Sequence, residues 1–431
     1  MKLKEYCKLC LLLFLNQIST ILNQFILIYT EQITNRIEYI FDFIMRDFSG
    51  IDFKLTSNKE DFLNSNSPKI NFSNHFFDNE INFQVDDVLI ENGIQNDVDY
   101  NNLKEVGKCF YWLSRYEEYI SKPHQFDNHN RFLGSDLDYS KPIVDQISLE
   151  IQKIILEKYP LLQFKKREFR QINTHDVDFS WKYLNKPFYE TMGSLGKKVL
   201  KGNFSEFKKQ LRVLNHREVD PYSKFDYLKK LAEKHNIETV FFWLLGDKTE
   251  FDRNLNWKNK EQANLIRETT EWAKVGIHPS YLSNFNNHSQ ALEIKRLENV
   301  LNKKVTISRQ HFIKLNFPST YQQLLINGIK EDFTIGFAHR TGFRAGTSTP
   351  FKWFDLSTNQ QTLLTTYPFV AMDVTLRNYM KLTTEEAILE LKRLKQITKD
   401  VNGTFITLFH QSNFEEEWSD WKVVYESIFN D

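Results

Sequence analysis

Residues 173–180 read NTHDVDFS and close an alternating segment, REFRQINT at residues 167–174, whose period of two predicts a β-strand. The stretch places two carboxylates, Asp176 and Asp178, one residue apart, with His175 beside them. Neighbouring strand residues point in opposite directions, but a turn after the strand can aim both carboxylates at one pocket. The stretch therefore predicts a functional site at the end of a strand.

After residue 165 the chain alternates between strand-like and helix-like runs. The strand-like runs are 169–174, 238–245, 274–278, 304–309, 333–338, 368–373 and 403–410. The helix-like runs between them include 223–236, 260–274, 288–302, 319–329 and 384–400. The last of these follows Thr383, which we expect to cap it. Seven strands with helical crossovers predict an α/β fold with parallel strands, as a barrel or a doubly wound sheet.

The first part of the chain has a mixed pattern. A strand-like run at 26–30 leads into a helix-like run at 30–45, and another amphipathic helix is expected at 101–121. The pattern of strand-like and helix-like runs changes near residue 165. This change predicts a separate N-terminal α/β domain at 25–164 and a second domain at 165–431.

Residues 1–24 are expected to be a dispensable extension. The segment KLKEYCKLCLLLFLNQ at 2–17 has lysines before an apolar run, but the run is short and no A-x-A-like cleavage site follows. It is far below the ~20 apolar residues that a membrane span needs. The segment therefore predicts neither a signal peptide nor a membrane span, which favours the cytoplasm.

The composition excludes several classes of protein. Among 431 residues, 56 are basic and 56 are acidic, so the net charge of zero gives no electrostatic argument for nucleic acid or an acidic membrane as partner. Three cysteines, Cys7, Cys10 and Cys109, cannot form a disulfide framework, and the C-x-x-C lacks a second pair. The hydrophobic share of 41% is enough for a large core.

Polar side chains gather where the predicted strands end, which is where barrels of this type carry their function. Five of the eleven histidines fall there, although any single one could be a capping or core residue. Besides His175, Asp176 and Asp178, these strand-end residues are His278, Arg309, His311, His339, Arg344, Asp373 and His410. We treat the other six histidines as surface or structural residues.

Aspartate and histidine together favour a borderline divalent metal such as Zn²⁺. A catalytic site would keep a position open for water, whose pKa the metal lowers, and the metal would polarise a carbonyl. A second carboxylate could take the proton, and a histidine across the site could protonate the leaving group. Of Asp176 and Asp178, one would then bind the metal and the other would be the base.

These motifs resemble those of the polysaccharide deacetylases of carbohydrate esterase family 4, the NodB-homology domain. The resemblance covers residues from about 165 to 431 and implies a distorted (β/α)7 barrel that removes acetyl groups from N-acetylated sugars with a divalent metal. The family motif TFDDG is similar to THDVD here, which implies Asp176 as base and Asp178, displaced by one residue, as metal ligand. The family motif H-[ST]-x-x-H is similar to HPSYL, which implies His278 as a ligand.

The later motifs of the family also have counterparts. GFRAGTSTP resembles R-x-P-x-G, which implies that Arg344 orients the base. Leu-Phe-His at 408–410 matches L-x-H, which implies His410 as the acid. Asp373 in MDVT would hold a charged partner near the site, as the family's fourth motif does.

The first part of the chain is similar to the domain that precedes the deacetylase barrel in one group of bacterial proteins. The segment SRYEEY, followed by the polar stretch DNHNRF, carries this resemblance. The simpler interpretation is that Arg115, Glu117 and Glu118 form the solvated face of a helix.

The chain departs from the family pattern in its second motif, where Leu282 takes the place of the second histidine. Asp178 and His278 alone cannot build a three-ligand site. We expect His311 to supply the third ligand from the next strand, and His339 is a poorer candidate because it lies in a loop-like segment.

Three functions stay open from the sequence. The first is a metal-dependent amidase that acts on an N-acetylated glycan. The second is a degenerate relative that binds glycan without turnover. The third is a metal hydrolase of a small non-sugar amide, because fold does not fix substrate. Four aromatic residues could stack on sugars, although for each we favour a place in the core: Trp243, Tyr281, Phe351 and Trp353.

Overall fold

The computed structural model describes residues 25–430, so the predictions on residues 1–24, Cys7 and Cys10 included, lie outside the described residues. The chain forms two compact units. Unit 1 comprises the residues up to Tyr116 together with Ile143–Arg167 and Phe354–Gln361. Unit 2 comprises Glu117–Pro142, Glu168–Trp353 and Thr362–Asp431. The expected domains at 25–164 and 165–431 stay a prediction.

Unit 1 contains a four-stranded parallel sheet in the order β2-β1-β3-β4. Its strands are β1 Phe25–Tyr29, β2 Asp52–Thr56, β3 Lys69–Phe72 and β4 Ile81–Phe83. Its helices are α2 Asn35–Phe41 with the π-helical η1 Asp42–Phe48, α3 Lys59–Asn64, α4 Asp87–Ile90, η2 Tyr100–Asn102, α5 Glu105–Leu113 and α7 Ile143–Lys158. The strand and helix expected at 26–45 are present, and Thr34 caps α2 by accepting from the backbone N–H of Ile37.

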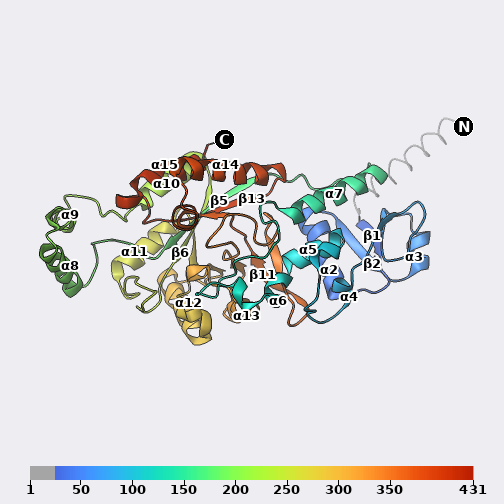
Figure 1. The fold of residues 1–431 in the computed structure, drawn as a ribbon, viewed down its shortest axis with the longest axis horizontal. Helices are drawn as coiled ribbons and strands as arrows, with labels where there is room; N and C mark the ends of the chain where they lie inside the picture. The colour runs from blue at the N-terminus through green and yellow to red at the C-terminus, as the bar shows by residue number, and fades with distance from the viewer. Residues whose placement is uncertain (1–24, 431) are drawn as a thin grey trace, which may run out of the picture. The chain divides into compact units, whose positions relative to one another are not determined.

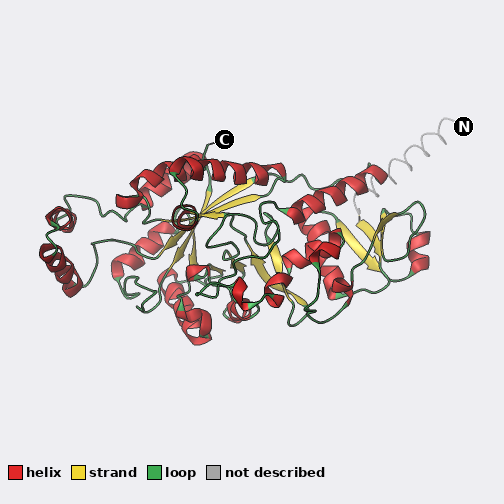
Figure 2. Cartoon of the chain, viewed as in Figure 1, coloured by secondary structure: helices red, strands yellow, loops and turns green. Residues whose placement is uncertain are grey.

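The larger sheet has nine strands in the order β10-β11-β9-β8-β7-β6-β5-β13-β12. They are β5 Arg170–Val177, β6 Glu238–Trp243, β7 Lys274–Ile277, β8 Ile307–Ser308, β9 Glu331–Asp332, β10 Phe351–Asp355, β11 Gln360–Thr366, β12 Ala371–Met372 and β13 Thr404–His410. The seven pairings from β11 through to β12 are parallel. Parallel neighbours need crossovers, and helices supply them (Figure 2).

Helices of unit 2 lie between the strands along the chain, and five of them match the helix-like runs of the sequence (Figure 1). They are α8 Phe188–Leu200, α9 Phe204–Leu214, α10 Phe225–His235, α11 Lys260–Thr269, α12 Asn287–Leu301, α13 Ser319–Ile326, α14 Thr384–Asp400 and α15 Lys422–Ser427. Shorter pieces are η3 Pro123–Gln125, η4 Leu282–Phe285, η5 His311–Ile313, the π-helical η6 Thr375–Tyr379 and η7 Glu416–Trp421, and α6 is Tyr116–Ile120. Thr383 begins α14 with a capping box, exchanging hydrogen bonds with Glu386 as the sequence predicts.

The core of unit 2 lies against the central strands. β5 and β13 are buried along almost their whole length, as strands covered on both faces are. A cluster of ten buried apolar residues includes Ile172, Val240, Phe242, Ile406 and Leu408, from three neighbouring strands. The parallel register sets His410 opposite Asp176, so two residues expected at the site sit on adjacent strands at one edge.

The structure confirms a mixed α/β fold, but the expected closed barrel is not seen in the strand pairing. Within the described residues the strand order is open, with β10 and β12 at its ends. Two backbone hydrogen bonds, from Phe369 N–H to Ile335 C=O and from Gly342 N–H to Val370 C=O, both at 2.9 Å, link the segments after β9 and before β12. The expected strand at 333–338 was wrong, because these buried residues run as a loop after β9.

Residues 117–142 are built into unit 2. Glu118 accepts two hydrogen bonds from Arg344, at 2.9 and 2.6 Å. The carbonyl of Tyr139 accepts from Phe343 N–H at 2.8 Å, and Gly342, at φ +125°, leaves room because a Cβ there would lie 2.4 Å from that carbonyl. The solvated helix face proposed for Arg115, Glu117 and Glu118 is therefore wrong, since all three side chains are buried.

Candidate metal centre and active site

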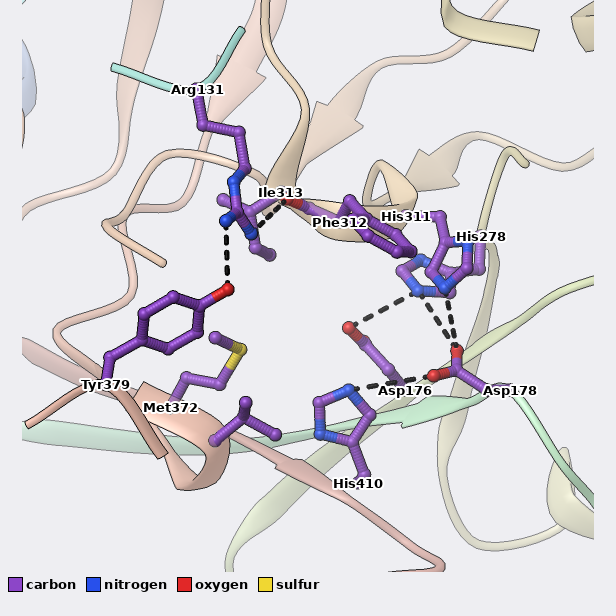
Figure 3. Close-up of a pocket in the computed structure, with 11 residues that line it drawn as sticks. Arg131, Asp176, Asp178, His278, His311, Phe312, Ile313, Met372, Tyr379 and His410 are labelled. Atoms are coloured by element: carbon purple, nitrogen blue, oxygen red, sulfur yellow. Dashed lines mark hydrogen bonds and ion pairs between the residues drawn. The ribbon is translucent and has the colours of Figure 1, made fainter. Parts of the chain in front are cut away.

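A pocket opens at the carboxyl ends of the central strands (Figure 3). Charged and polar side chains make up most of its wall, together with four apolar side chains. Its lining consists of Arg131, Asp176, Asp178, His278, His311, Phe312, Ile313, Met372, Val374, Tyr379 and His410. Seven of the residues singled out in the sequence are therefore in or directly behind this wall, because Asp373 contacts His410 and Arg309 contacts Asp176.

Three potential metal ligands converge in the pocket. Asp178 follows β5, His278 follows β7 and His311 begins η5 after β8. One ligand atom from each lies within 4.8 Å of the others. The Nε2 atoms of His278 and His311 are 3.5 and 3.7 Å from Oδ1 of Asp178. This is the grouping that the sequence predicted in place of the missing second-motif histidine.

Hydrogen bonds behind the two imidazoles fix which nitrogen faces the pocket. His278 Nδ1 lies 2.6 Å from the backbone carbonyl of Arg309, which can only accept, so Nδ1 donates. His311 Nδ1 lies 2.8 Å from Oδ1 of Asp252, in the loop after β6. In the neutral imidazoles Nε2 then carries the lone pair, which is the state that a metal needs.

The donor set fits a divalent metal. Oδ1 of Asp178 is buried and accepts no hydrogen bond from the described residues, which is costly for a carboxylate oxygen unless a cation meets it. Burial raises the pKa of Asp178, but the nearby His311, His410 and His278 outweigh it and hold the carboxyl pKa well below its usual range. Two imidazole nitrogens and one carboxylate oxygen are a common ligand set for catalytic zinc.

In the metal-free protein, a proton on His311 compensates part of the negative charge of the nearby carboxylates. Burial lowers the pKa of His311 most, yet the charges and hydrogen bonds of Asp178 and Asp252 together raise it to about 9. His278 behaves differently, because burial dominates and lowers its pKa. A metal that binds at neutral pH would therefore displace a proton from His311.

Asp176 is held by Arg309. Oδ1 of Asp176 accepts from Nη1 of Arg309 at 3.1 Å, and both side chains are buried. Arg309 is fixed in turn by a hydrogen bond from Nε to the carbonyl of Phe333 and by the ring of Phe242, 4.6 Å from its guanidinium. Oδ2 of Asp176 lies 3.5 Å from Nε2 of His278, on the pocket side.

Arg344 does not hold Asp176. Its hydrogen bonds go to both carboxylate oxygens of Glu118 and, from Nη1 at 2.9 Å, to the carbonyl of Gly336. Arg344 is not among the pocket-lining residues, so the structure places Arg309 where the family resemblance implied Arg344. Arg309 also follows a predicted strand, so the same strand-end signal marked both arginines.

His410 and Asp373 form a second pair. His410 Nδ1 lies 2.9 Å from Oδ1 of Asp373, whose Oδ2 accepts from the backbone of His410 at 2.8 Å and from Asn413 at 3.0 Å. Burial lowers the pKa of His410 most, but Asp373 outweighs it and, with Asp178 and Asp176, raises the pKa to about 10. The Nε2 atom lies 3.8 Å from Oδ2 of Asp178, across the pocket from the other two histidines (Figure 3).

Several sequence candidates lie elsewhere. His175 does not share the pocket with Asp176, because strand alternation turns it to the other face, onto Phe241 and within 3.1 Å of the Tyr425 hydroxyl. Burial lowers its pKa to about 3. His339 is half-buried beside Phe337 and is not a pocket-lining residue. The four aromatic residues weighed for sugar stacking are all buried, which confirms their place in the core: Trp243, Tyr281, Phe351 and Trp353.

Two neighbouring pocket residues have left-handed backbones. Phe312 has φ +61° and Ile313 has φ +55°, although neither is glycine and isoleucine is β-branched. Such conformations cost of order 1–3 kcal/mol each and persist where the surroundings impose them. They immediately follow His311, and no sequence signal marked them.

The similarity of this chain to known proteins is limited. Residues 26–160 match the family model DUF7033, described as a family of unknown function. No curated protein matches the chain. Among solved structures, a candidate polysaccharide deacetylase from Mycobacterium smegmatis is 13% identical, with 62% of this chain and 87% of that chain covered and a TM-score of 0.39.

Two further solved structures have similar values. A polysaccharide deacetylase from Bacillus cereus is 11% identical, with 61% of this chain and 86% of that chain covered and a TM-score of 0.29. A CE4 family pseudoenzyme from Bacillus anthracis is 11% identical, with 60% and 61% covered and a TM-score of 0.30. All three TM-scores are low, so what this chain does has to be inferred from its own site.

None of the helices in residues 25–430 combines the length and apolar character that a bilayer crossing requires.

Proposed function

We propose that unit 2 is a metal-dependent hydrolase that removes acetyl groups from an N-acetylated sugar of a polysaccharide or glycan precursor. The observation that carries the proposal is the convergence, in one pocket, of a complete three-ligand set with a buried aspartate and a histidine–aspartate pair. The order of the motifs along the chain, which resembles that of carbohydrate esterase family 4, supports the choice of substrate and of family.

The metal ligands in this proposal are Asp178, His278 and His311. A divalent metal, Zn²⁺ by the character of these donors, would supply Lewis acidity that polarises a carbonyl and lowers the pKa of water. Asp252 and the carbonyl of Arg309 hold the two imidazoles so that Nε2 faces the metal.

Asp176 is the proposed general base. Arg309 occupies Oδ1, which leaves Oδ2 to take a proton from water at the pocket side. As the water oxygen bonds to the acetamide carbonyl carbon, its proton passes to Asp176.

His410 is the proposed general acid. Asp373 holds Nδ1, so the proton available to the substrate is on Nε2, which faces the pocket. Because its pKa is raised to about 10, His410 carries both ring protons at neutral pH and can give one to the departing sugar nitrogen when the carbon–nitrogen bond breaks. The products are acetate and the free amine.

The degenerate, binding-only alternative rested on a lost ligand. His311, which begins η5 after β8, supports a full ligand set instead, because it groups with Asp178 and His278. The apolar part of the pocket wall, with Ile313, Met372 and Val374, offers a surface for an acetyl methyl group.

The proposal is tested by two measurements on the full chain. Elemental analysis should find one zinc per chain, and acetate should be released from N-acetylglucosamine oligomers, with both signals lost after chelation. Asp176→Asn should keep the metal but lose acetate release, and His339→Ala should keep both. A chain that takes up no zinc in excess, or that binds zinc and leaves every acetylated glycan intact, would contradict the proposal.

A further inference from the structure

Two helices that the sequence pattern did not reveal form a hairpin inserted between β5 and α10. α8 and α9 pack side by side and are joined by a short turn at residues 201–203. Figure 1 draws them apart from the helices that flank the large sheet. The insertion begins at the carboxyl end of β5, the edge at which the pocket lies.

The inner side of the hairpin is well fixed. Leu195 of α8 is buried, and Ser194 Oγ lies 3.1 Å from Oε1 of Gln210 on α9. Glu206 of α9 accepts from the Tyr183 hydroxyl at 2.7 Å, and Lys209 bonds Glu416 of η7 at 3.2 Å. The hairpin therefore has a defined inner face and a defined outer face.

The outer face exposes large apolar side chains. Leu200 is 90% exposed and Phe188 is 79% exposed. The other exposed apolar residues of the hairpin are Tyr189, Met192, Val199 and Phe204. A single exposed apolar residue needs no explanation, but six within two short helices do.

Five of these residues share one side of α8. Phe188, Met192 and Val199 are four and then seven residues apart, so they form one row, which borders the buried Leu195, and Tyr189 and Leu200 form the next row on the far side from Leu195. Gly193 and Gly196 lie beside these rows, and a Cβ at either position would meet no atom within 4 Å. The outer face of α8 is thus a continuous apolar strip.

Positive charge borders this strip. Residues 188–214 contain six basic and two acidic residues, a net charge of +4 in a chain whose net charge is zero. Lys197 and Lys201 are exposed on α8 and at the turn, and Lys208 is exposed on α9. An apolar helical face bordered by lysines is the pattern of helices that lie in a bilayer surface.

We propose that the α8–α9 hairpin binds the surface of an anionic phospholipid bilayer. The strip of Phe188, Met192, Val199 and Leu200 would enter the boundary between headgroups and acyl chains, and the lysines would meet the lipid phosphates. The helices, of 13 and 11 residues, are too short to cross the membrane, so they lie in its surface. This proposal does not depend on the proposed hydrolase activity.

The charge favours a bilayer over a second copy of the chain. Two copies that paired through this strip would bring lysines of the same sign together, whereas anionic lipid would neutralise them. The zero net charge of the chain does not oppose this, because a local patch acts within the screening length of the solution.

The test is flotation of the full chain with vesicles. Vesicles of equal parts phosphatidylglycerol and phosphatidylcholine should carry the protein, and vesicles of phosphatidylcholine alone should carry much less. Leu200→Glu with Phe188→Ser should weaken binding to the anionic vesicles by roughly tenfold or more. Leu389→Glu is the matched control, because Leu389 is also exposed but lies on α14, and this variant should bind like wild type.

Three results would overturn the proposal. The first is a wild-type chain that does not float with the anionic vesicles, and the second is a Leu389→Glu variant that loses binding as the hairpin variant does. The third is a wild-type dimer that the hairpin substitutions dissociate, without vesicle binding, which would make the strip an interface between copies. Equal thermal melting of the variants would show that exposed positions were changed without unfolding the chain.

Discussion

Arg309 donates a 3.1 Å hydrogen bond from Nη1 to Oδ1 of Asp176, and both side chains are shut off from solvent. A buried ion pair of this kind contributes less to stability than the short distance between its two charged groups suggests, because both groups have lost their hydration. Its larger effect is on position, since the hydrogen bond to Oδ1 fixes the carboxylate with Oδ2 on the pocket side. The pair therefore keeps a base ready at the pocket.

Arg309→Met should leave Asp176 buried without its partner. We expect a loss of about 3–5 kcal/mol in the free energy of unfolding and, in the chain that remains folded, a loss of acetate release of roughly a hundredfold. Thermal melting and acetate release per folded molecule measure the two effects.

Arg344→Met is the matched control for this prediction. It also removes one partner of a buried pair, with Glu118, and should destabilise the chain by a similar amount. Acetate release per folded molecule should stay near the wild-type value, because Arg344 does not reach the pocket. If Arg344→Met removes activity as fully as Arg309→Met, the assignment of Arg309 to the base fails.

Removal of a ligand should reduce bound zinc. His278→Ala and His311→Ala each leave two donors, and zinc content after dialysis should fall from one per chain to a small fraction. Elemental analysis of purified protein checks this, with His339→Ala as the histidine variant that keeps its metal. A His311→Ala chain with full zinc content would show that the third ligand lies elsewhere.

Asp252 should affect the affinity for zinc although it is not one of the proposed metal ligands. Oδ1 of Asp252 accepts a hydrogen bond from Nδ1 of His311 at 2.8 Å and another from the backbone N–H of Tyr281 at 2.9 Å. Asp252→Asn can present an amide nitrogen to His311 and favour the wrong tautomer, so zinc affinity should fall roughly 10–100-fold. Competition with a chelating dye measures the affinity, and unchanged binding would contradict the role.

Glu293 should make stability depend on pH. It is 4% exposed and accepts from the backbone and hydroxyl of Ser280, yet burial outweighs these bonds and raises its pKa from 4.5 to about 7. Between these values the folded chain binds one more proton than the unfolded chain, so stability is full below pH 4.5 and falls as pH rises through about 7.

Glu293→Gln should therefore flatten this part of the stability profile. Its amide oxygen can still accept from the Ser280 N–H, and the Ser280 hydroxyl can turn to accept from the amide. Urea unfolding across this pH range compares the two proteins, and an equally steep fall in the variant would exclude Glu293 as the cause.

The sequence was sufficient for the parts of the fold that depend on local pattern. Thr383 and Glu386, three residues apart, form the capping motif that predicts the start of α14. The alternating pattern around Asp176 predicts β5. The run at 333–338 shows where pattern fails. A buried loop and a buried strand are both continuous apolar runs, and only backbone pairing tells them apart.

The sequence could predict those site residues that lie at the carboxyl end of a predicted strand. His311 could be proposed because it follows the strand after that of His278, and the two lie together in the structure. Asp252 could not be found in this way, because it lies in a loop 59 residues before its partner. The choice between Arg309 and Arg344 depends on which carboxylate each one meets, Asp176 or Glu118.

The inclusion of residues 117–142 in unit 2 has a consequence for how this protein can be divided. The backbone passes between the two units at five places, so no single cut releases either of them whole. A gene fragment that began at Glu168 would encode Arg344 without Glu118, so a buried guanidinium would lose its carboxylate partner. Recombination that moved this unit into another protein would have to carry that earlier segment along with it.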